Sequence, residues 1–262
     1  MPRFAANLTM LYNEHDFVDR FAAAAADGFE GVEFLFPYAY KKELLADLLN
    51  EHRLTLALHN MPAGDWAGGE RGLGCLPGRE EEFRADVVRA IEYATALGCK
   101  RVNCLAGIPP KEAPAAEVRR TFVENLRHAA PEFANAGIRL VIEAINSRDI
   151  PGFYLNRSAQ AIELMDEVGS DNLFLQYDFY HMQIMEGDLV PTFRRLKDRI
   201  GHVQIADNPN RNEPGTGEIN YPFIFAALDE AGYESWIGCE YKPKAGTSAG
   251  LGWFKPYRTR NT

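Results

Sequence analysis

Short apolar runs alternate with longer amphipathic segments along almost the whole chain, and this alternation limits the choice of fold more than any other feature. Eight runs have the length and composition of strands: residues 3–8, 31–35, 54–58, 101–106, 139–145, 173–178, 201–206 and 236–241. Segments between them show helical spacing of apolar side chains, as in residues 79–97. Repeated strand–helix units predict parallel α/β topology, and eight strands close a (β/α)8 TIM barrel.

Glycines punctuate this pattern just before predicted strands, at positions 28, 98, 137, 169 and 232. Glycine is the usual residue where a helix ends in the left-handed conformation. No linker-like stretch divides the chain, so residues 1–262 are predicted to form a single α/β TIM-barrel domain. An open doubly wound sheet is the alternative, but no GxGxxG motif follows the first strand run.

The charge and the cysteines restrict the class of protein. The net charge of −9 disfavours binding to the phosphate backbone of a nucleic acid. Four cysteines without a CxxC pair, and an N-terminus without a signal-like apolar stretch, predict a cytoplasmic protein. No run reaches the length of a membrane span, so no membrane partner is expected. Association of the chain into a homo-oligomer stays an open alternative.

Four polar residues stand at the ends of predicted strands: Glu143, Asp178, Gln204 and Glu240. In a TIM barrel the carboxyl ends of the strands meet at one mouth, where three carboxylates would repel one another unless a divalent cation joined them. An all-oxygen donor set suits Mg²⁺ or Mn²⁺. A structural ion pair is the alternative for each residue taken alone.

Two histidines are candidates for holding a substrate oxygen. His181 follows Asp178 by three residues, and His59 ends the third strand run. A purely structural role is the alternative for each. His202 lies inside a strand run and receives no assignment, although its side chain can point into the barrel.

Two long loops, residues 60–78 and 207–220, carry Arg71 and Arg211. Long loops in a compact domain often have a function, and an arginine can clamp a carboxylate with two parallel hydrogen bonds. We therefore expect Arg71 and Arg211 to bind a small anionic hydroxy- or oxo-acid. A solvated surface charge is the alternative for each arginine.

Several long motifs resemble the hydroxypyruvate isomerase family, within the xylose isomerase-like TIM-barrel superfamily. They are LHNMPAGDWAGGERG (58–72), PGREEEF (77–83), YDFYHMQIMEG (177–187), HVQIADNPNRNEPGTGEINY (202–221) and GCEYKP (238–243). The resemblance implies interconversion of hydroxypyruvate and 2-hydroxy-3-oxopropanoate through an enediol, with Glu143 and Glu240 as the acid–base pair. The 2-oxo-tetronate isomerases, which interconvert 2-dehydro-erythronate and 3-dehydro-erythronate, share much of the pattern and are the alternative.

Two further members of the superfamily bear on the metal. The ketose 3-epimerases bind a divalent metal through Glu, Asp, His and Glu at the corresponding strand ends, and this chain has Gln204 at the third position. The amide keeps an oxygen donor and removes the imidazole.

A zinc-dependent abasic-site endonuclease is a remote alternative, because such enzymes need many histidines and a basic groove, whereas this chain has six histidines and a charge of −9.

Overall fold

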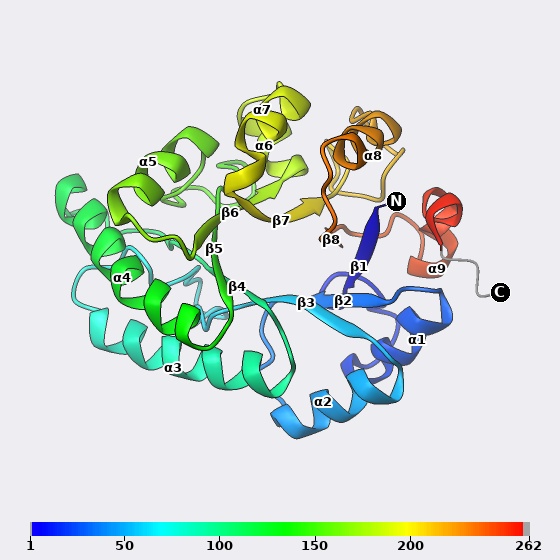
Figure 1. The fold of residues 1–262 in the computed structure, drawn as a ribbon, viewed down its shortest axis with the longest axis horizontal. Coiled ribbons are helices and arrows are strands. Elements are labelled where there is room, and N and C mark those ends of the chain that lie inside the picture. The colour runs from blue at the N-terminus through cyan, green and yellow to red at the C-terminus, as the bar shows by residue number, and fades with distance from the viewer. Residues whose placement is uncertain (1, 259–262) are drawn as a thin grey trace.

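The computed structural model describes residues 2–258 and joins the eight predicted strands into one closed parallel barrel, in which β1 lies beside β8 (Figure 1). Residues 1 and 259–262 of the predicted domain lie outside the described residues. The strands are β1 Arg3–Asn7, β2 Gly31–Phe34, β3 Thr55–Asn60, β4 Arg101–Cys104, β5 Arg139–Glu143, β6 Leu173–Asp178, β7 Ile200–Ile205 and β8 Trp236–Cys239. Every strand end lies within two residues of its predicted position, and closure excludes the doubly wound alternative.

Helices surround this barrel on the outside (Figure 1). The α-helices are α1 Arg20–Ala26, α2 Lys42–Glu51, α3 Glu80–Ala96, α4 Ala115–Asn135, α5 Ser158–Val168, α6 Phe179–Met185, α7 Leu189–Leu196, α8 Tyr221–Glu230 and α9 Thr247–Gly250. Short 3-10 helices occupy Phe17–Asp19, Lys197–Arg199, Leu251–Trp253 and Lys255–Tyr257. In the described part of the chain, no helix combines the length and the apolar character needed to cross a membrane.

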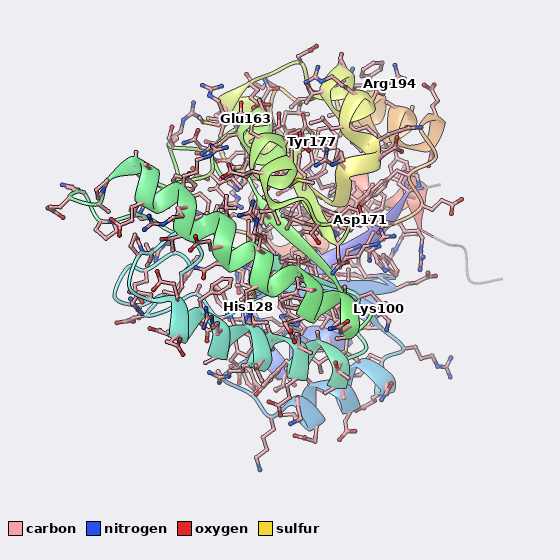
Figure 2. The ribbon with its side chains drawn as sticks, turned by 60° about the vertical axis from the view of Figure 1, so that its left-hand side comes forward. Lys100, His128, Glu163, Asp171, Tyr177 and Arg194 are labelled. Atoms are coloured by element: carbon pink, nitrogen blue, oxygen red, sulfur yellow. The ribbon has the colours of Figure 1, made fainter. Side chains whose placement is uncertain are left out.

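The helix α3 shows how the sequence pattern becomes packing. Its residues Phe83, Val87 and Ala94 are buried, as the spacing predicts, and three glutamates occupy its first turn, where the helix dipole favours negative charge. Figure 2 shows α3 and α4 lying side by side, with the exposed His128 on α4.

Glycines end helices as predicted. All five predicted positions have a positive φ. At the end of α5, Gly169 has φ 71° and ψ 30° and its backbone N–H donates to the carbonyl of Met165. A side chain with a Cβ would be strained in this conformation, so glycine allows the chain to turn directly toward β6.

Side chains alternate between the two faces of each strand, and this alternation selects what reaches the interior of the barrel. In β5, Leu140 and Ile142 belong to the large apolar core, while Val141 faces Gly201 of β7 inside the barrel. Ala5, Ala57 and Trp236 form a separate cluster of buried residues. Because side chains alternate with a period of two, the residue two positions after each inward-facing one also points inward. These residues lie toward the carboxyl ends of the strands, where the barrel mouth is.

Candidate active site

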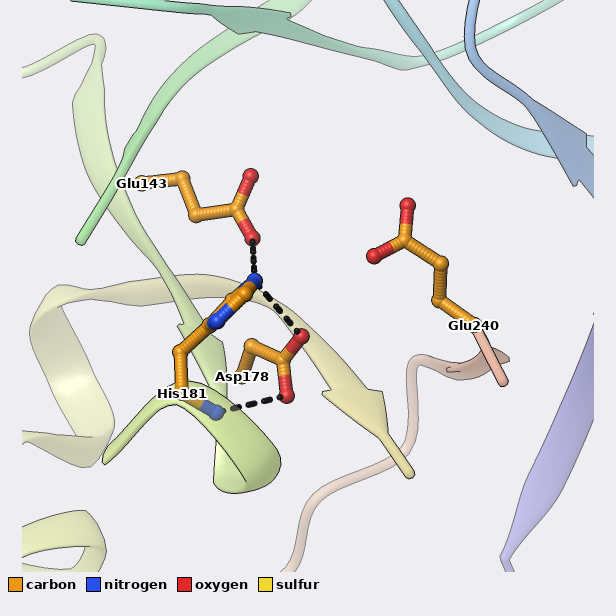
Figure 3. A group of neighbouring side chains, drawn as sticks. All are labelled: Glu143, Asp178, His181 and Glu240. Atoms are coloured by element: carbon orange, nitrogen blue, oxygen red, sulfur yellow. Dashed lines mark hydrogen bonds and ion pairs between the residues drawn. The ribbon is translucent and has the colours of Figure 1, made fainter. Parts of the chain in front are cut away.

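Four ionisable side chains meet at the carboxyl end of the barrel: Glu143, Asp178, His181 and Glu240 (Figure 3). Each offers one potential ligand atom, and these atoms all lie within 4.8 Å of one another. All four residues are buried. The structure thus brings together three of the four residues expected to bind a metal and one of the two candidate histidines.

The local structure explains the placement. Glu143 and Asp178 are the last residues of the neighbouring strands β5 and β6, and Glu240 directly follows β8. The Asp178 carboxylate also caps α6, because its Oδ1 accepts the backbone N–H of Tyr180 at 2.7 Å and of His181 at 3.4 Å. This cap begins the helix at the strand end and so turns His181 toward the carboxylates.

Burial and mutual repulsion change the proton affinities of the group. Burial, with the charges of Glu240 and Asp178, raises the pKa of Glu143 well above its ordinary value of 4.5. Burial raises the pKa of Glu240 to about 8, although Arg211 opposes the change, and it raises the pKa of Asp178 to about 6. Burial lowers the pKa of His181 well below 6.5. Carboxyl groups here can therefore carry protons near neutral pH, as general acids require.

The carboxylate oxygens of this group could hold a metal ion. Glu143 Oε1 and Asp178 Oδ2 are buried without a hydrogen-bond partner. Buried oxygen atoms of this kind are costly unless a donor or a cation satisfies them. A divalent cation among the carboxylates would satisfy both atoms and relieve the repulsion that raises the pKa of Glu143.

Arg211 reaches this group from the loop between β7 and α8. Its guanidinium pairs with the carboxylate of Glu240 and lies 3.4 Å from Asp149 Oδ2, and it stacks 5.1 Å above the ring of Tyr180. Burial lowers the pKa of Arg211, but the surrounding carboxylates, led by Glu240, outweigh burial and raise that pKa above its ordinary value. This predicted substrate-binding cation is therefore already placed at the mouth.

The loop that carries Arg211 is ordered by a buried carboxylate that the sequence reasoning missed. Asp207, directly after β7, accepts the backbone N–H groups of Gly215 and Gly217 at 2.9 Å and that of Ile219 at 3.0 Å. These bonds fix both ends of the loop. The Asp-to-glycine pattern in DNPNRNEPGTG is the signal that indicates such a turn network.

Gln204, the fourth predicted metal ligand, has other partners in the structure. Its Nε2 donates to Glu33 Oε1 at 2.7 Å, and its Oε1 accepts from Gln176 Nε2 at 2.6 Å. Glu33 is fully buried and also contacts His202 Nε2 at 2.8 Å and Asn7 Nδ2 at 3.0 Å. Gln204 is thus part of an interior polar network, and its role as a metal ligand stays a prediction.

The interior network also touches the four-residue group. Asn7 Nδ2 lies 3.4 Å from Glu240 Oε1, and Asn103 Nδ2 donates to Glu143 Oε2 at 2.9 Å. The sequence reasoning missed Asn7, Glu33 and Asn103. The rule that selected strand-end residues in the second half of the chain would have found them in β1, β2 and β4.

The remaining predicted residues lie apart from these contacts. His59 is fully buried in β3, with Nδ1 2.9 Å from the carbonyl of Asn60 and Nε2 without a partner. Arg71 lies 4.3 Å above the ring of Trp66 and donates to two carbonyls of its own loop. Within residues 2–258, no hydrogen bond or ion pair joins Arg71 to the four-residue group.

Both the sequence and the fold of this chain are similar to those of known proteins. Residues 21–257 match the family model of the xylose isomerase-like TIM barrel. Hydroxypyruvate isomerase of Escherichia coli is 55% identical over 258 residues, which cover 98% of this chain and all of the relative. The 2-oxo-tetronate isomerase of Cupriavidus necator is 54% identical over 260 residues, 99% of this chain and all of the relative. A crystal structure of an AP endonuclease, family 2, from Brucella melitensis is 46% identical with a TM-score of 0.97, covering 99% of this chain and 100% of that one.

Proposed function

Since this chain belongs to the xylose isomerase-like TIM-barrel family and is an isomerase, we propose that it interconverts hydroxypyruvate and 2-hydroxy-3-oxopropanoate through an enediol. The observation that carries the proposal is the pair of buried carboxyl groups, Glu143 and Glu240, which face each other across the mouth (Figure 3). Isomerisation needs a base that removes a proton from one carbon and an acid that returns one to the next.

The proton balance of the reaction defines the steps, and a second carboxyl group, or the same one, returns the carbon proton. One carboxylate removes a proton from C3 of hydroxypyruvate, and the resulting enediolate receives a proton at C2. The hydroxyl proton passes from the oxygen on C3 to the oxygen on C2. Without a metal ion, burial raises the pKa of Glu240 to about 8 and also raises the pKa of Glu143, so either group can carry a proton near neutral pH. Arg211 holds Glu240 in place from the loop side.

The carboxylates of Glu143, Asp178 and Glu240 would hold Mg²⁺ or Mn²⁺, with Gln204 as the predicted fourth ligand. The hard oxygen donors and the unpartnered Glu143 Oε1 and Asp178 Oδ2 support this assignment. When bound, such an ion stabilises negative charge on an oxygen next to the reacting carbon.

The substrate carboxylate would bind to Arg211, the partly buried cation at the mouth, and Arg71 stays a predicted second clamp from its own loop. His181 would hold a substrate oxygen from the side of Asp178, and His59 would do so from β3. The unpartnered Nε2 of His59, fully buried, supports that role.

The acid–base assignment is tested by turnover in D₂O. We expect Glu143→Gln and Glu240→Gln each to lower kcat for hydroxypyruvate by about 10²- to 10⁴-fold and to lower deuterium incorporation at the migrating position. The matched control is Glu163→Gln, the same change on the exposed face of α5. Wild-type turnover by either of the first two variants would exclude that residue from the pair.

A four-carbon substrate is the second candidate, favoured by the 54% identity to a 2-oxo-tetronate isomerase. The two acids differ by one hydroxymethine group. A side-by-side measurement of kcat/KM for hydroxypyruvate and 2-dehydro-erythronate decides between them, and the higher value identifies the substrate. Abasic DNA belongs in the same assay because of the similarity to the Brucella protein, and zinc-dependent cleavage of it without turnover of either acid would overturn the proposed reaction.

A further inference from the structure

Asn146 is a fully buried amide three residues after Glu143, and its orientation is fixed by backbone donors. Its Oδ1 accepts the backbone N–H of Arg148 at 3.0 Å and of Asp149 at 2.7 Å. Because a backbone N–H can only donate, the atom facing these two groups must be the amide oxygen. The NH₂ group therefore points the other way.

On that other side lies the ring of His181. Asn146 Nδ2 is 2.6 Å from His181 Nδ1, and the backbone N–H of Asn146 is directed at the same atom from 3.4 Å. Both groups are donors, so His181 Nδ1 must accept and cannot carry a proton. The proton of the neutral ring then sits on Nε2.

The protonated nitrogen is directed into the four-residue group. His181 Nε2 lies 3.6 Å from Asp178 Oδ2 and 3.8 Å from Glu143 Oε1, beyond ordinary hydrogen-bond distance from either (Figure 3). An N–H group in this position can donate to a third oxygen placed between the carboxylates. It cannot bind a metal ion, because its lone pair is used by the proton.

We propose that Asn146 is a positioning residue that holds His181 in the tautomer with the proton on Nε2, so that His181 donates to a substrate oxygen and stays outside the ligand set of the metal. The tautomer follows from hydrogen-bond chemistry alone, whereas its use in the reaction rests on the proposed function. Glu143, Asp178 and Glu240 then remain as the ionisable ligands.

His59 provides an internal contrast. Its Nδ1 lies 2.9 Å from the carbonyl of Asn60, which can only accept, so Nδ1 carries the proton and Nε2 is a bare acceptor. The two rings are therefore opposite tautomers: Nε2 of His181 is a hydrogen-bond donor, and Nε2 of His59 is an acceptor.

The test uses ¹⁵N NMR of the histidine rings, which distinguishes the two tautomers without turnover. The signals of His181 are assigned by their loss in His181→Gln. We expect wild-type His181 to have a protonated Nε2 and a bare Nδ1. Asn146→Asp keeps an oxygen for the two backbone N–H groups but replaces the NH₂ by an acceptor, so we expect Nδ1 to become protonated. The matched control, Asn220→Asp at the exposed cap of α8, should leave the spectrum of His181 unchanged.

Two results would overturn the tautomer assignment: a protonated Nδ1 in the wild-type protein, or a bare Nδ1 in Asn146→Asp. Zn²⁺, a diamagnetic ion that favours imidazole, tests the ligand set, and loss of the Nε2 proton on adding it would place His181 among the ligands.

The functional role has its own readout. We expect Asn146→Asp to lower kcat/KM for hydroxypyruvate by about 10- to 100-fold, as loss of a supporting partner typically does, while Asn220→Asp retains it. Unchanged kcat/KM together with an altered tautomer would refute the role of Asn146. A wild-type protein that has the expected tautomer but no isomerase activity would refute the proposed function and leave the tautomer standing.

Discussion

Substitution of Asp178 tests most directly how much the buried charges of the site lower the free energy of unfolding. Its carboxylate is buried, with Oδ1 bonded to backbone N–H groups and Oδ2 without a partner. In Asp178→Asn, the amide oxygen can keep the cap on α6, since Asn and Asp cap helices about equally well. The substitution therefore removes the buried charge while preserving the local structure.

The sign and size of the effect follow from the pKa. Burial raises the pKa of Asp178 from 3.8 to about 6, so ionisation of the folded protein is unfavourable. Each tenfold change in proton affinity is worth about 1.4 kcal/mol, which gives about 3 kcal/mol in total. This penalty is absent below pH 3.8, grows between pH 3.8 and about 6, and is complete above. In metal-free protein at pH 8, Asp178→Asn should thus be about 3 kcal/mol more stable than wild type.

The assay is thermal unfolding in chelator at several pH values. For a chain of 262 residues, about 3 kcal/mol corresponds to a Tm difference of about 5 °C at pH 8, shrinking toward zero as the pH falls to 4. Asp166→Asn is the control, because Asp166 pairs with Arg199 on the surface and should give a change of at most about 1 kcal/mol with little pH dependence. The electrostatic reasoning would be refuted if Asp178→Asn were less stable than wild type at pH 8. It would also be refuted if the gain in Tm were the same at pH 8 and pH 4.

Three further predictions concern the site and its support. Mg²⁺ or Mn²⁺ at 100 times its Kd should stabilise the wild type against unfolding by about 2.7 kcal/mol, and calorimetry should find no such gain in Asp178→Asn. Arg211→Lys should raise KM for hydroxypyruvate by about 10- to 100-fold, because lysine loses the planar fork that binds a carboxylate; an unchanged KM would remove Arg211 from the substrate site. A Cβ at Gly238 would lie 2.3 Å from Glu33 Oε2, so Gly238→Ala should lower the free energy of urea unfolding by about 1–3 kcal/mol, whereas Gly252→Ala, with nothing within 4 Å, should be near neutral; equal effects would contradict the proposed close packing.

The fold was predictable because a parallel barrel buries both faces of every strand. Its strands therefore appear in the sequence as short apolar runs, and each of the eight runs was found. The placement of Glu143, Asp178 and Glu240 was predictable for a related reason. At the end of such a run, a charged side chain avoids the high free energy of burial in an apolar core only if it lies at the mouth of the barrel.

The partners of each side chain could not be predicted in the same way. Gln204 ends a strand run like the carboxylates, yet its amide is held by Glu33, 171 residues away in the chain. Likewise, Arg71 and Arg211 lie in similar long loops, and only Arg211 meets the carboxylates. Hydrogen-bond pairing inside a closed barrel depends on strand register and rotamers, which no local pattern encodes.

The interior network links the choice of metal ligand to residues that no metal would touch. Gln204→His would introduce an imidazole at the mouth, but a ring nitrogen that binds a metal cannot also accept from Gln176, and the ring has a shorter reach toward Glu33. Glu33 would then lose a donor while remaining sealed from water. Converting this barrel to a nitrogen-ligated centre therefore requires compensating substitutions one layer deeper, at position 33 or 176, and a redesign confined to the rim would leave the Glu33 side chain short of a hydrogen-bond donor.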